Sequence, residues 1–202
     1  IRAAPLFDRE GNLWVPTHHQ GLHRFAKAQT LITLQRDHAP DSMTRKDGLT
    51  SDLINAVIED NEGSIWVGTE EGVDRLREAA LVREPALGKP ARFGDKLLAA
   101  RDGSVYIAQA DTVFRVPASG KPEPVVRGLV EPEALCEAED GALWIALRDH
   151  ILVWSPAGER RIPRPDRHAR HNIVYDCAID PRGRYWMSAA GGGVHRYANG
   201  RW

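Results

Sequence analysis

Two adjacent histidines, His18 and His19, are the residues whose types most directly suggest chemistry. Imidazole is the commonest side-chain ligand for metals in proteins, so the pair invites a metal-binding interpretation. Successive residues of a strand point to opposite faces, so the pair could chelate only in a turn and with ligands from elsewhere. His150 and His171 could supply them only if the fold brings them close. We therefore expect no metal site and no cofactor.

Sequence motifs of the common enzyme classes are missing. The chain has no G-x-S-x-G nucleophile elbow, no Walker loop, no dinucleotide-binding glycine pattern and no H-E-x-x-H. The run Gly191-Gly192-Gly193 is not a phosphate cradle, because such a cradle needs a following helix and none is predicted there. We expect no catalytic residue in this chain.

Composition places the chain among globular proteins. Its 202 residues are 42% hydrophobic and 27% charged, and 27 basic against 28 acidic residues leave a net charge of −1. This balance excludes a general attraction to nucleic acid or to anionic membranes. No apolar stretch approaches the roughly 20 residues of a membrane helix. Because the chain opens on Ile1 without a signal-peptide pattern and closes on Trp202, we expect it to be cut from a longer protein.

The two cysteines, Cys136 and Cys177, are too few for a disulfide scaffold, and no Cys/His spacing suggests zinc. We expect both to be small buried hydrophobic residues.

A repeat organises the sequence. Tryptophan follows glycine by three residues in one recurring frame, and tyrosine takes its place once. The five copies are Gly11-Asn12-Leu13-Trp14, Gly63-Ser64-Ile65-Trp66, Gly103-Ser104-Val105-Tyr106, Gly141-Ala142-Leu143-Trp144 and Gly183-Arg184-Tyr185-Trp186. The aromatic positions are 52, 40, 38 and 42 residues apart. A period near 40 is shared by propeller blades and by helical HEAT-type arrays.

Local patterns decide between these two repeat classes. Seven or eight residues after each aromatic position begins a short apolar segment such as Val73-Asp74-Arg75-Leu76, and another precedes each glycine. The segments are short, rich in β-branched and aromatic residues, and bounded by Gly, Asp, Asn and Pro, as strands are. A helical repeat would need apolar residues at i, i+3, i+4 and i+7 over ten or more positions. We therefore predict an all-β fold of β-propeller blades.

Each blade is expected to be a four-stranded antiparallel sheet. Its first two strands are joined by an Asp-Gly turn such as Asp60-Asn61-Glu62-Gly63, and its outer strand is weak, with Thr30–Leu34 the best example. Radial stacking covers both faces of each blade, so the aromatic residues are mainly architectural. The chain is interpreted as one propeller region, 1–202, with approximate blades 1–36, 50–87, 92–127, 131–163 and 171–202.

Binding is expected on one face of the disc, where the turns after the second strands meet the connections between blades. The candidate ligand-binding residues are His18, His19, Glu70, Glu71, Arg92, Arg148, Asp149, His171 and Asn172. Further polar residues predicted for this face are Gln20, Ser51, Asp52, Asn55, Asp111, Glu131, Glu133 and His150. As a set they indicate a polar face of mixed charge.

The stretch from Asp47 to Leu76 closely resembles the two-component regulator propeller repeat, through its Gly-Leu start and its "IEDNEGSIWVGTEEGVDRL" core. Gly11 to Phe25 is a second good copy, with Pro16 in place of the usual glycine, and Gly183 to Tyr197 is a looser one. The two middle units are degenerate. The resemblance covers nearly the whole chain, strongly in two blades and only by frame in three.

This resemblance implies a sensory role. Proteins with such repeats look like bacterial transmembrane receptors whose periplasmic propeller precedes a membrane helix and a histidine kinase or diguanylate cyclase output. It implies a larger ring, commonly of seven blades, unless five blades close on themselves. The implied partners are a small-molecule ligand, for example glycan-derived, the receptor's own membrane and output domains, and a second copy in a homodimer. No nucleic-acid partner is expected.

Two other functions stay open at this stage. Lyases and lactonases also use propellers, and such an enzyme would cluster His18 or His171 with acids or a metal near the axis. A protein-interaction scaffold would instead use the faces or edges of the disc.

Overall fold

The computed structural model describes residues 3–30, 39–77, 80–83, 87, 95–118, 120–165, 173–190 and 192–202. These residues form β-strands joined by turns, with two short 3-10 helices, η1 (Ala28–Thr30) and η2 (Arg45–Asp47). The prediction of an all-β propeller-type fold is confirmed.

The described strands form five antiparallel sheets, and in each sheet strands that are consecutive in the chain lie side by side. The first sheet contains β1 (Leu6–Phe7), β2 (Leu13–Pro16), β3 (Leu22–Phe25) and β4 (Asp41–Met43). The second contains β5 (Ile54–Glu59), β6 (Ile65–Thr69), β7 (Val73–Arg77) and β8 (Ala80–Arg83). The third contains β9 (Lys96–Ala99), β10 (Val105–Gln109), β11 (Thr112–Val116) and β12 (Glu123–Val126). The fourth contains β13 (Ala134–Glu137), β14 (Leu143–Ala146), β15 (His150–Ser155) and β16 (Gly158–Pro163). The fifth contains β17 (Val174–Ile179), β18 (Tyr185–Ala189) and β19 (Gly193–Tyr197).

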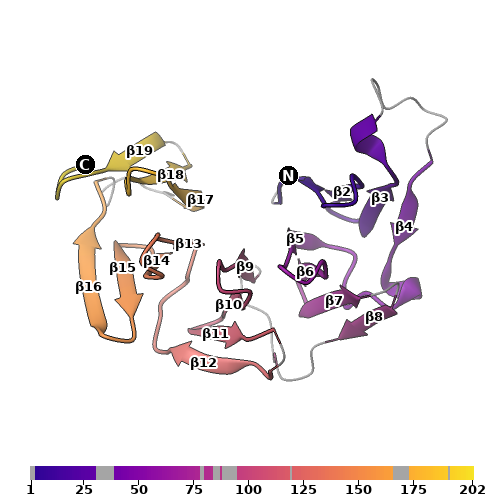
Figure 1. The fold of residues 1–202 in the computed structure, drawn as a ribbon, viewed down its shortest axis with the longest axis horizontal. Coiled ribbons are helices and arrows are strands. Elements are labelled where there is room, and N and C mark those ends of the chain that lie inside the picture. The colour runs from indigo at the N-terminus through magenta and orange to yellow at the C-terminus, as the bar shows by residue number, and fades with distance from the viewer. Residues whose placement is uncertain are drawn as a thin grey trace.

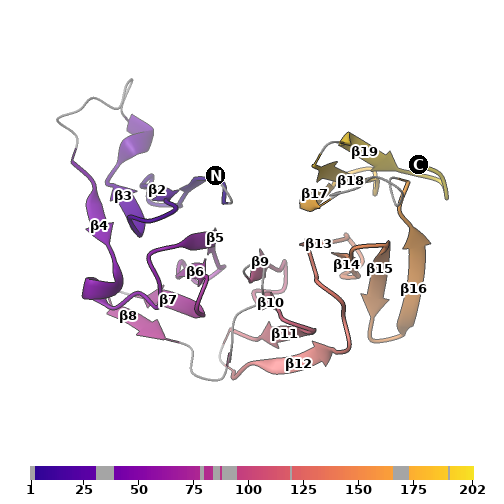
Figure 2. The ribbon, with the colours of Figure 1, turned by 180° about the vertical axis from the view of Figure 1, so that it is seen from behind.

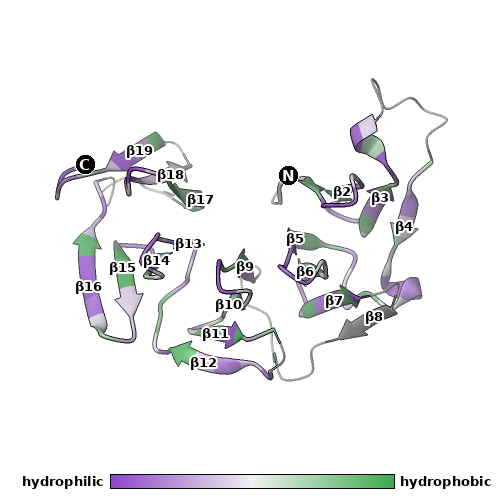
Figure 3. Ribbon diagram, in the orientation of Figure 1, coloured by the Kyte–Doolittle hydropathy of each residue, from purple (hydrophilic) through white to green (hydrophobic). Residues whose placement is uncertain are grey.

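The sheets stand side by side around an arc. Figures 1 and 2 show their first strands toward the centre and their last strands at the periphery, with the arc open between the first and the fifth sheet. Neighbouring inner strands contact one another from β1 through β5, β9 and β13 to β17. Figure 3 shows that the outer strand β16 is mostly hydrophilic, and only Ile162 of this strand is buried.

The hydrophobic core consists of four clusters, one in each interface between adjacent sheets. Each cluster contains the aromatic residue of one sheet and apolar residues of the next. Trp14, Trp66, Tyr106 and Trp144 occupy these positions, and each is at most 8% exposed. In the last interface Trp144 stacks on Tyr185 of the following sheet, with ring centroids 4.9 Å apart. The repeated aromatic residue therefore fills the gap between one blade and the next.

Three of the indoles are held by an aspartate of the turn that precedes them. The indole N–H donates to the carboxylate six residues earlier, from Trp14 to Asp8 at 2.8 Å, from Trp66 to Asp60 at 2.7 Å and from Trp186 to Asp180 at 2.9 Å. The other carboxylate oxygen of Asp60 accepts the backbone N–H groups of Glu62 and Ser64. Gly63 leaves this turn at φ +83°, a conformation that glycine adopts without steric cost. The motif thus fixes turn and indole together.

An arginine side chain lies over the ring of the repeated tryptophan. Strand register places Arg24 opposite Trp14, Arg75 opposite Trp66 and Arg196 opposite Trp186. Each guanidinium lies 4.9–5.7 Å from the ring centroid, within cation–π range. In the fourth sheet Val153 stands opposite Trp144, and Arg160, the partner of Val153 on β16, covers the ring at 5.2 Å.

The outer strand of the first sheet differs from the prediction. Thr30 lies in η1, and residues 31–34 lie outside the described residues. The strand that pairs with β3 is β4, which ends beyond the predicted blade limit at residue 36. β4 is polar apart from Met43, which packs against the cluster around Trp14. A single anchoring residue therefore places this edge strand, where an apolar run was expected.

The far side of the fifth sheet lacks the cover that the other sheets have. The first large apolar residue of the third strand is 0–1% exposed in the first four sheets, at Leu22, Val73, Val113 and Ile151. Its counterpart Val194 is 69% exposed, because no described sheet follows. The five sheets thus form part of a larger ring.

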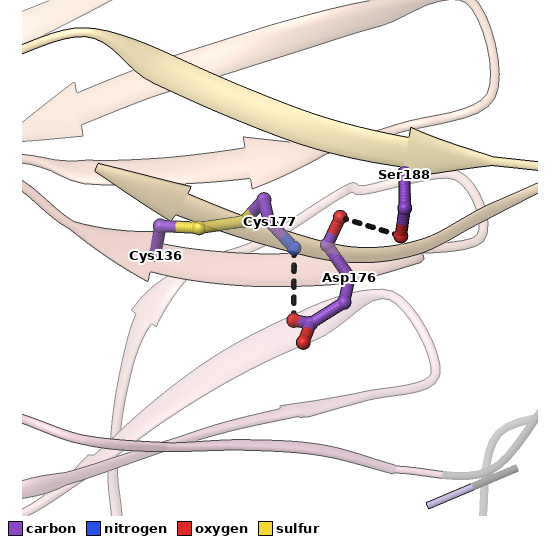
Figure 4. Close-up of a disulfide and its surroundings, with 4 residues drawn as sticks. All are labelled: Cys136, Asp176, Cys177 and Ser188. Atoms are coloured by element: carbon purple, nitrogen blue, oxygen red, sulfur yellow. Dashed lines mark hydrogen bonds between the residues drawn. A yellow bond between two sulfur atoms is a disulfide. The ribbon is translucent and has the colours of Figure 1, made fainter. Parts of the chain in front are cut away.

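The two cysteines are not free buried residues, which corrects the sequence-based expectation. Cys136 on β13 and Cys177 on β17 form a disulfide between the inner strands of adjacent sheets (Figure 4). Cys136 pairs with Trp144, whose ring faces the fifth sheet, and Cys177 pairs with Met187, which packs toward the fourth. Strand alternation therefore aims both thiols into one interface. The carboxylate of Asp176 accepts the backbone N–H of Cys177 at 2.8 Å beside the bridge.

Reduction of this disulfide should weaken the domain measurably. The bridge closes a separation of 41 residues, for which the loop-entropy model gives about 4 kcal/mol of stabilisation and measured disulfides typically about 2–4 kcal/mol. We expect urea unfolding with dithiothreitol to lose roughly that amount. The double variant Cys136→Ala, Cys177→Ala should show the same loss and no further response to reductant. Equal stability of the oxidised and reduced wild type would contradict the cross-blade linkage.

Candidate functional site

The face on which binding was predicted exists as a surface of hydrogen-bonded turns, here called the connection face. It comprises the turns after the second strands (17–21, 70–72, 110–111 and 147–149) and the connections between sheets (44–53, 127–133 and 164–165). Gly21 donates to the carbonyl of Asp52 at 3.0 Å, and Leu129 donates to that of Asp111 at 2.9 Å. The predicted meeting of turns and connections is therefore confirmed.

His18 and His19 lie exposed in the turn between β2 and β3. The Nδ1 atom of His18 is 2.8 Å from the Nε2 atom of His19, so the two imidazoles are placed to share a proton. Within the described ranges no three His, Cys, Asp or Glu side chains gather as metal ligands would. The pair is therefore a surface feature of this turn.

The acidic pair Glu70 and Glu71 lies in the turn between β6 and β7. Arg45, from η2 in the preceding connection, donates to both oxygens of Glu71, at 2.5 and 3.0 Å. Hydrogen bonding to Glu71 raises the pKa of Arg45. Thr69 accepts the N–H of Glu71 and donates to the carbonyl of Gly72, which closes the turn. Glu71 thus ties the turn to the connection, while Glu70 is exposed.

Arg148 and Asp149 lie in the turn between β14 and β15. A nitrogen of Arg148 is 3.6 Å from a carboxylate oxygen of Glu131, and Asp149 is 2.7 Å from the Nδ1 of His150. The hydrogen bond from His150 lowers the pKa of Asp149. Figure 1 shows the first and fourth sheets on opposite limbs of the arc, so the structure does not bring these groups to His18 and His19. The remaining candidates, Arg92, His171 and Asn172, lie outside the described residues.

Glu133, predicted for the same face, is a buried structural residue. Its carboxylate accepts the guanidinium of Arg164 at 2.9 Å and the backbone N–H of Val174 at 2.8 Å. Arg164 also donates to the carbonyls of Leu147 and Arg148. The pair therefore fastens the start of β17 to the fourth sheet. Burial raises the pKa of Glu133, and the bonds from Val174 and Arg164 only partly offset that rise.

A pocket between the first and second sheets extends to the turns at the other end of the strands, here called the hairpin face. This face comprises the turns between the first and second strands: 8–12, 60–64, 100–104, 138–142 and 180–184. Its turns are joined along the arc: Arg9 donates to the carbonyl of Asn61 at 2.8 Å, and the N–H of Arg101 donates to Glu137 at 2.9 Å. The sequence-based candidate residues were all assigned to the connection face, so no prediction was made for this one.

The first pocket lies between the first and second sheets and has a volume of about 560 Å³. It is lined by Asp8, Arg9, Glu10, Asn12, Trp14, Arg24, Met43, Asp47, Glu59, Asn61, Glu62, Gly63, Ile65 and Leu76. The volume lies in the range of small-molecule sites. A difference between repeats could have revealed it, because Asn12 stands where the best-matching repeat has Ser64.

Two further pockets lie at other interfaces. One of about 600 Å³, between the fourth and fifth sheets, includes Trp144, Trp154 and Arg160. A smaller one of about 220 Å³ is lined by the inner strands beside the disulfide, from Leu98 to Ile179.

One of the repeats matches a known protein family. Residues 48–71 match the family model described as two component regulator propeller. The chain carries a two-component regulator propeller repeat. The matched residues include the turn Asp60–Gly63 and Trp66, the elements that fasten the second blade to its neighbours. No curated protein sequence matches the chain.

Solved structures have a similar fold. The extracellular domain of the hybrid two component system BT4673 from B. thetaiotaomicron superposes with a TM-score of 0.72 at 18% identity, over 96% of this chain and 26% of that one. The chain thus spans about a quarter of that domain.

Enzymes with propellers also superpose. A catalytically inactive virginiamycin B lyase from Staphylococcus aureus, with quinupristin, gives a TM-score of 0.72 at 12% identity, over 98% of this chain and 67% of that one. A gluconolactonase from Xanthomonas campestris gives 0.65 at 17% identity, over 96% and 71%. At these identities the likeness is one of fold.

The buried pair of Glu133 and Arg164 generates a prediction about pH. Burial makes Glu133 easier to protonate in the folded chain than in the unfolded chain, so the folded state binds the extra proton. The contribution of Glu133 to stability should therefore be largest below the ordinary pKa of glutamate and decrease as the pH rises through the raised pKa. Glu133→Gln should remove this decrease while keeping an oxygen for Val174 and Arg164.

Chemical denaturation between pH 4 and pH 8 measures the effect, with Glu133→Leu as the comparison. The leucine variant leaves Arg164 and the Val174 N–H without their acceptor and should lose about 3–5 kcal/mol. If the wild type and Glu133→Gln had parallel pH profiles, the assigned pKa direction would be wrong.

Proposed function

We propose that this chain is part of the periplasmic, ligand-binding propeller of a bacterial signal-transduction receptor, and that it is not itself an enzyme. The observation that carries the proposal is the propeller repeat at residues 48–71, within a fold similar to the extracellular domain of a hybrid two component system. The input role comes from that likeness, because fold alone does not specify function.

The disulfide supports the proposed compartment. Structural disulfides persist in oxidising environments such as the bacterial periplasm and are rare in the cytosol. Cys136 and Cys177 join two blades, so the bridge has a structural position. Among the described residues no helix is long and apolar enough to cross a membrane.

The geometry supports small-molecule binding through the pocket between the first and second sheets. Its walls combine an apolar part, which includes Trp14, with many polar and charged side chains, and its volume is that of a small-molecule site. The stimulus is proposed to be a small molecule. A glycan fragment is the class implied by the family resemblance.

A propeller enzyme is the second candidate, because a lyase and a gluconolactonase share the fold. Such an enzyme would turn over the compound that stabilises it. A receptor propeller would bind the compound and release it unchanged.

A thermal-shift screen with product analysis separates the two functions. Purified protein is heated with oligosaccharides, amino acids, short peptides and lactones, and each stabilising compound is then incubated and analysed by mass spectrometry. A ligand at 100 times its Kd adds about 2.7 kcal/mol, or about 5–10 °C in Tm for a domain of this size. Stabilisation without conversion is the expected result. Conversion that is lost in His18→Ala would establish an enzyme and overturn the receptor proposal.

A further inference from the structure

The pocket between the first and second sheets contains charged groups of both signs over an apolar wall. Trp14, Met43, Ile65 and Leu76 supply the apolar part. Five carboxylates and two arginines supply the charge. The ligand class depends on which of these charges the protein already neutralises.

Most of the charged groups are already engaged by the protein. The carboxylate of Asp8 accepts hydrogen bonds from Asn12 and Trp14, and that of Asp47 accepts from Thr44. The carboxylate of Glu59 accepts the backbone N–H of Arg9. The carboxylate of Glu62 accepts from Arg75 and forms an ion pair of 3.5 Å with Arg77. Arg9 donates to the carbonyls of Asp60 and Asn61. These groups build the walls of the pocket and have little bonding capacity left for a ligand.

Arg24 differs from its counterpart in the second sheet. Arg75 donates to Asp60, Glu62 and Ser64 at 3.0–3.1 Å. Across the described residues Arg24 makes no hydrogen bond, and its ion-pair contact with Asp41 is 4.0 Å long. The Nε atom is buried without a partner in both arginines, so the difference lies in the terminal nitrogens. The cause lies in the turn, where Asn12 replaces serine.

Asn12 takes the acceptor that the arginine uses in the second sheet. Its amide donates to the Oδ2 of Asp8 at 2.8 Å, the oxygen that also binds the indole of Trp14. In the second sheet the corresponding oxygen of Asp60 binds Trp66 and Arg75. The substitution therefore leaves the guanidinium of Arg24 free to bind a ligand.

Glu10 is the complementary group. It is exposed on the turn, and its contact with Asn12 is long, at 3.4 Å. Its counterpart Glu62 is bound by Arg75. With asparagine at position 12, the guanidinium of Arg24 and the carboxylate of Glu10 therefore both keep hydrogen-bonding capacity in the same pocket.

We propose that this pocket binds a zwitterion with an apolar side chain, namely an amino acid or short peptide. Its carboxylate pairs with Arg24, its ammonium group pairs with Glu10, and its side chain packs against the apolar wall. This inference rests on the proposed function, in that the chain binds a small ligand, and names the ligand class for this site.

Charge complementarity separates this ligand from the alternatives. Hydrogen bonds between two charged groups are roughly twice as strong as neutral ones. A neutral sugar would leave both charges uncompensated, and a simple amine or acid would compensate only one of them. A ligand that carries both charges satisfies both groups.

Titration calorimetry with leucine, leucyl-leucine and trileucine tests the proposal, because the series varies the distance between the two charges. We expect saturable binding of at least one member. Blocking its amino group by acetylation, or its carboxylate as the amide, should each weaken binding at least about tenfold, because a charged hydrogen bond is lost. This comparison needs no variant. Failure of all three compounds to bind would overturn the proposal.

Variants then locate the site. Arg24→Gln and Glu10→Gln should each weaken binding of the best peptide at least about tenfold. Exposed residues of the same charges elsewhere, Arg182→Gln and Glu123→Gln, should leave it unchanged. Binding that survives both Arg24→Gln and Glu10→Gln would overturn the site. If an oligosaccharide binds and no peptide does, the receptor proposal stands and this inference fails. If no compound of any class binds, the receptor proposal itself loses its support.

Discussion

The structure depends on one repeated contact, in which the aromatic residue of a blade is buried against the next blade. A four-stranded sheet cannot bury both of its faces alone, so each sheet needs its neighbour. Trp14, Trp66, Tyr106 and Trp144 make this contact at the four interfaces. Aromatic side chains bury the largest apolar areas of any residues, so they dominate such interfaces. The polar motif around the ring exists to hold it in place.

That motif also explains where the repeats differ. Asp60 binds both the turn and the indole of Trp66, and Arg75 closes over the ring. In the first blade Asn12 instead binds the carboxylate of Asp8, Arg24 makes no hydrogen bond to the described residues, and a pocket lies beside the ring. The fourth blade keeps the cation–π contact by using Arg160 from the next strand. The proposed binding site therefore lies where the structural motif differs between repeats.

Spacing in the sequence was enough to predict the strands, the turns and the repeated aromatic residue, because these depend on local patterns. It did not predict contacts that depend on how blades meet. The disulfide was missed although Cys136 and Cys177 differ by one position in strand register, which turns them toward each other. β4 was misplaced because Met43 alone anchors it. Candidate residues were placed on the connection face because polar turns are visible in sequence, whereas the pocket between sheets would have needed a comparison of Asn12 with Ser64.

The central claim is most directly tested by comparing two tryptophan variants, one at a ring that the next sheet covers and one at a ring that no described sheet covers. Trp66 is 1% exposed beneath the third sheet, whereas Trp186 is half-buried at the open end of the arc. Equilibrium urea unfolding should show that Trp66→Ala loses about 3–5 kcal/mol, as buried tryptophans do, and that Trp186→Ala loses clearly less. Equal losses for the two variants would contradict the view that each aromatic residue stabilises the chain through the blade that follows it.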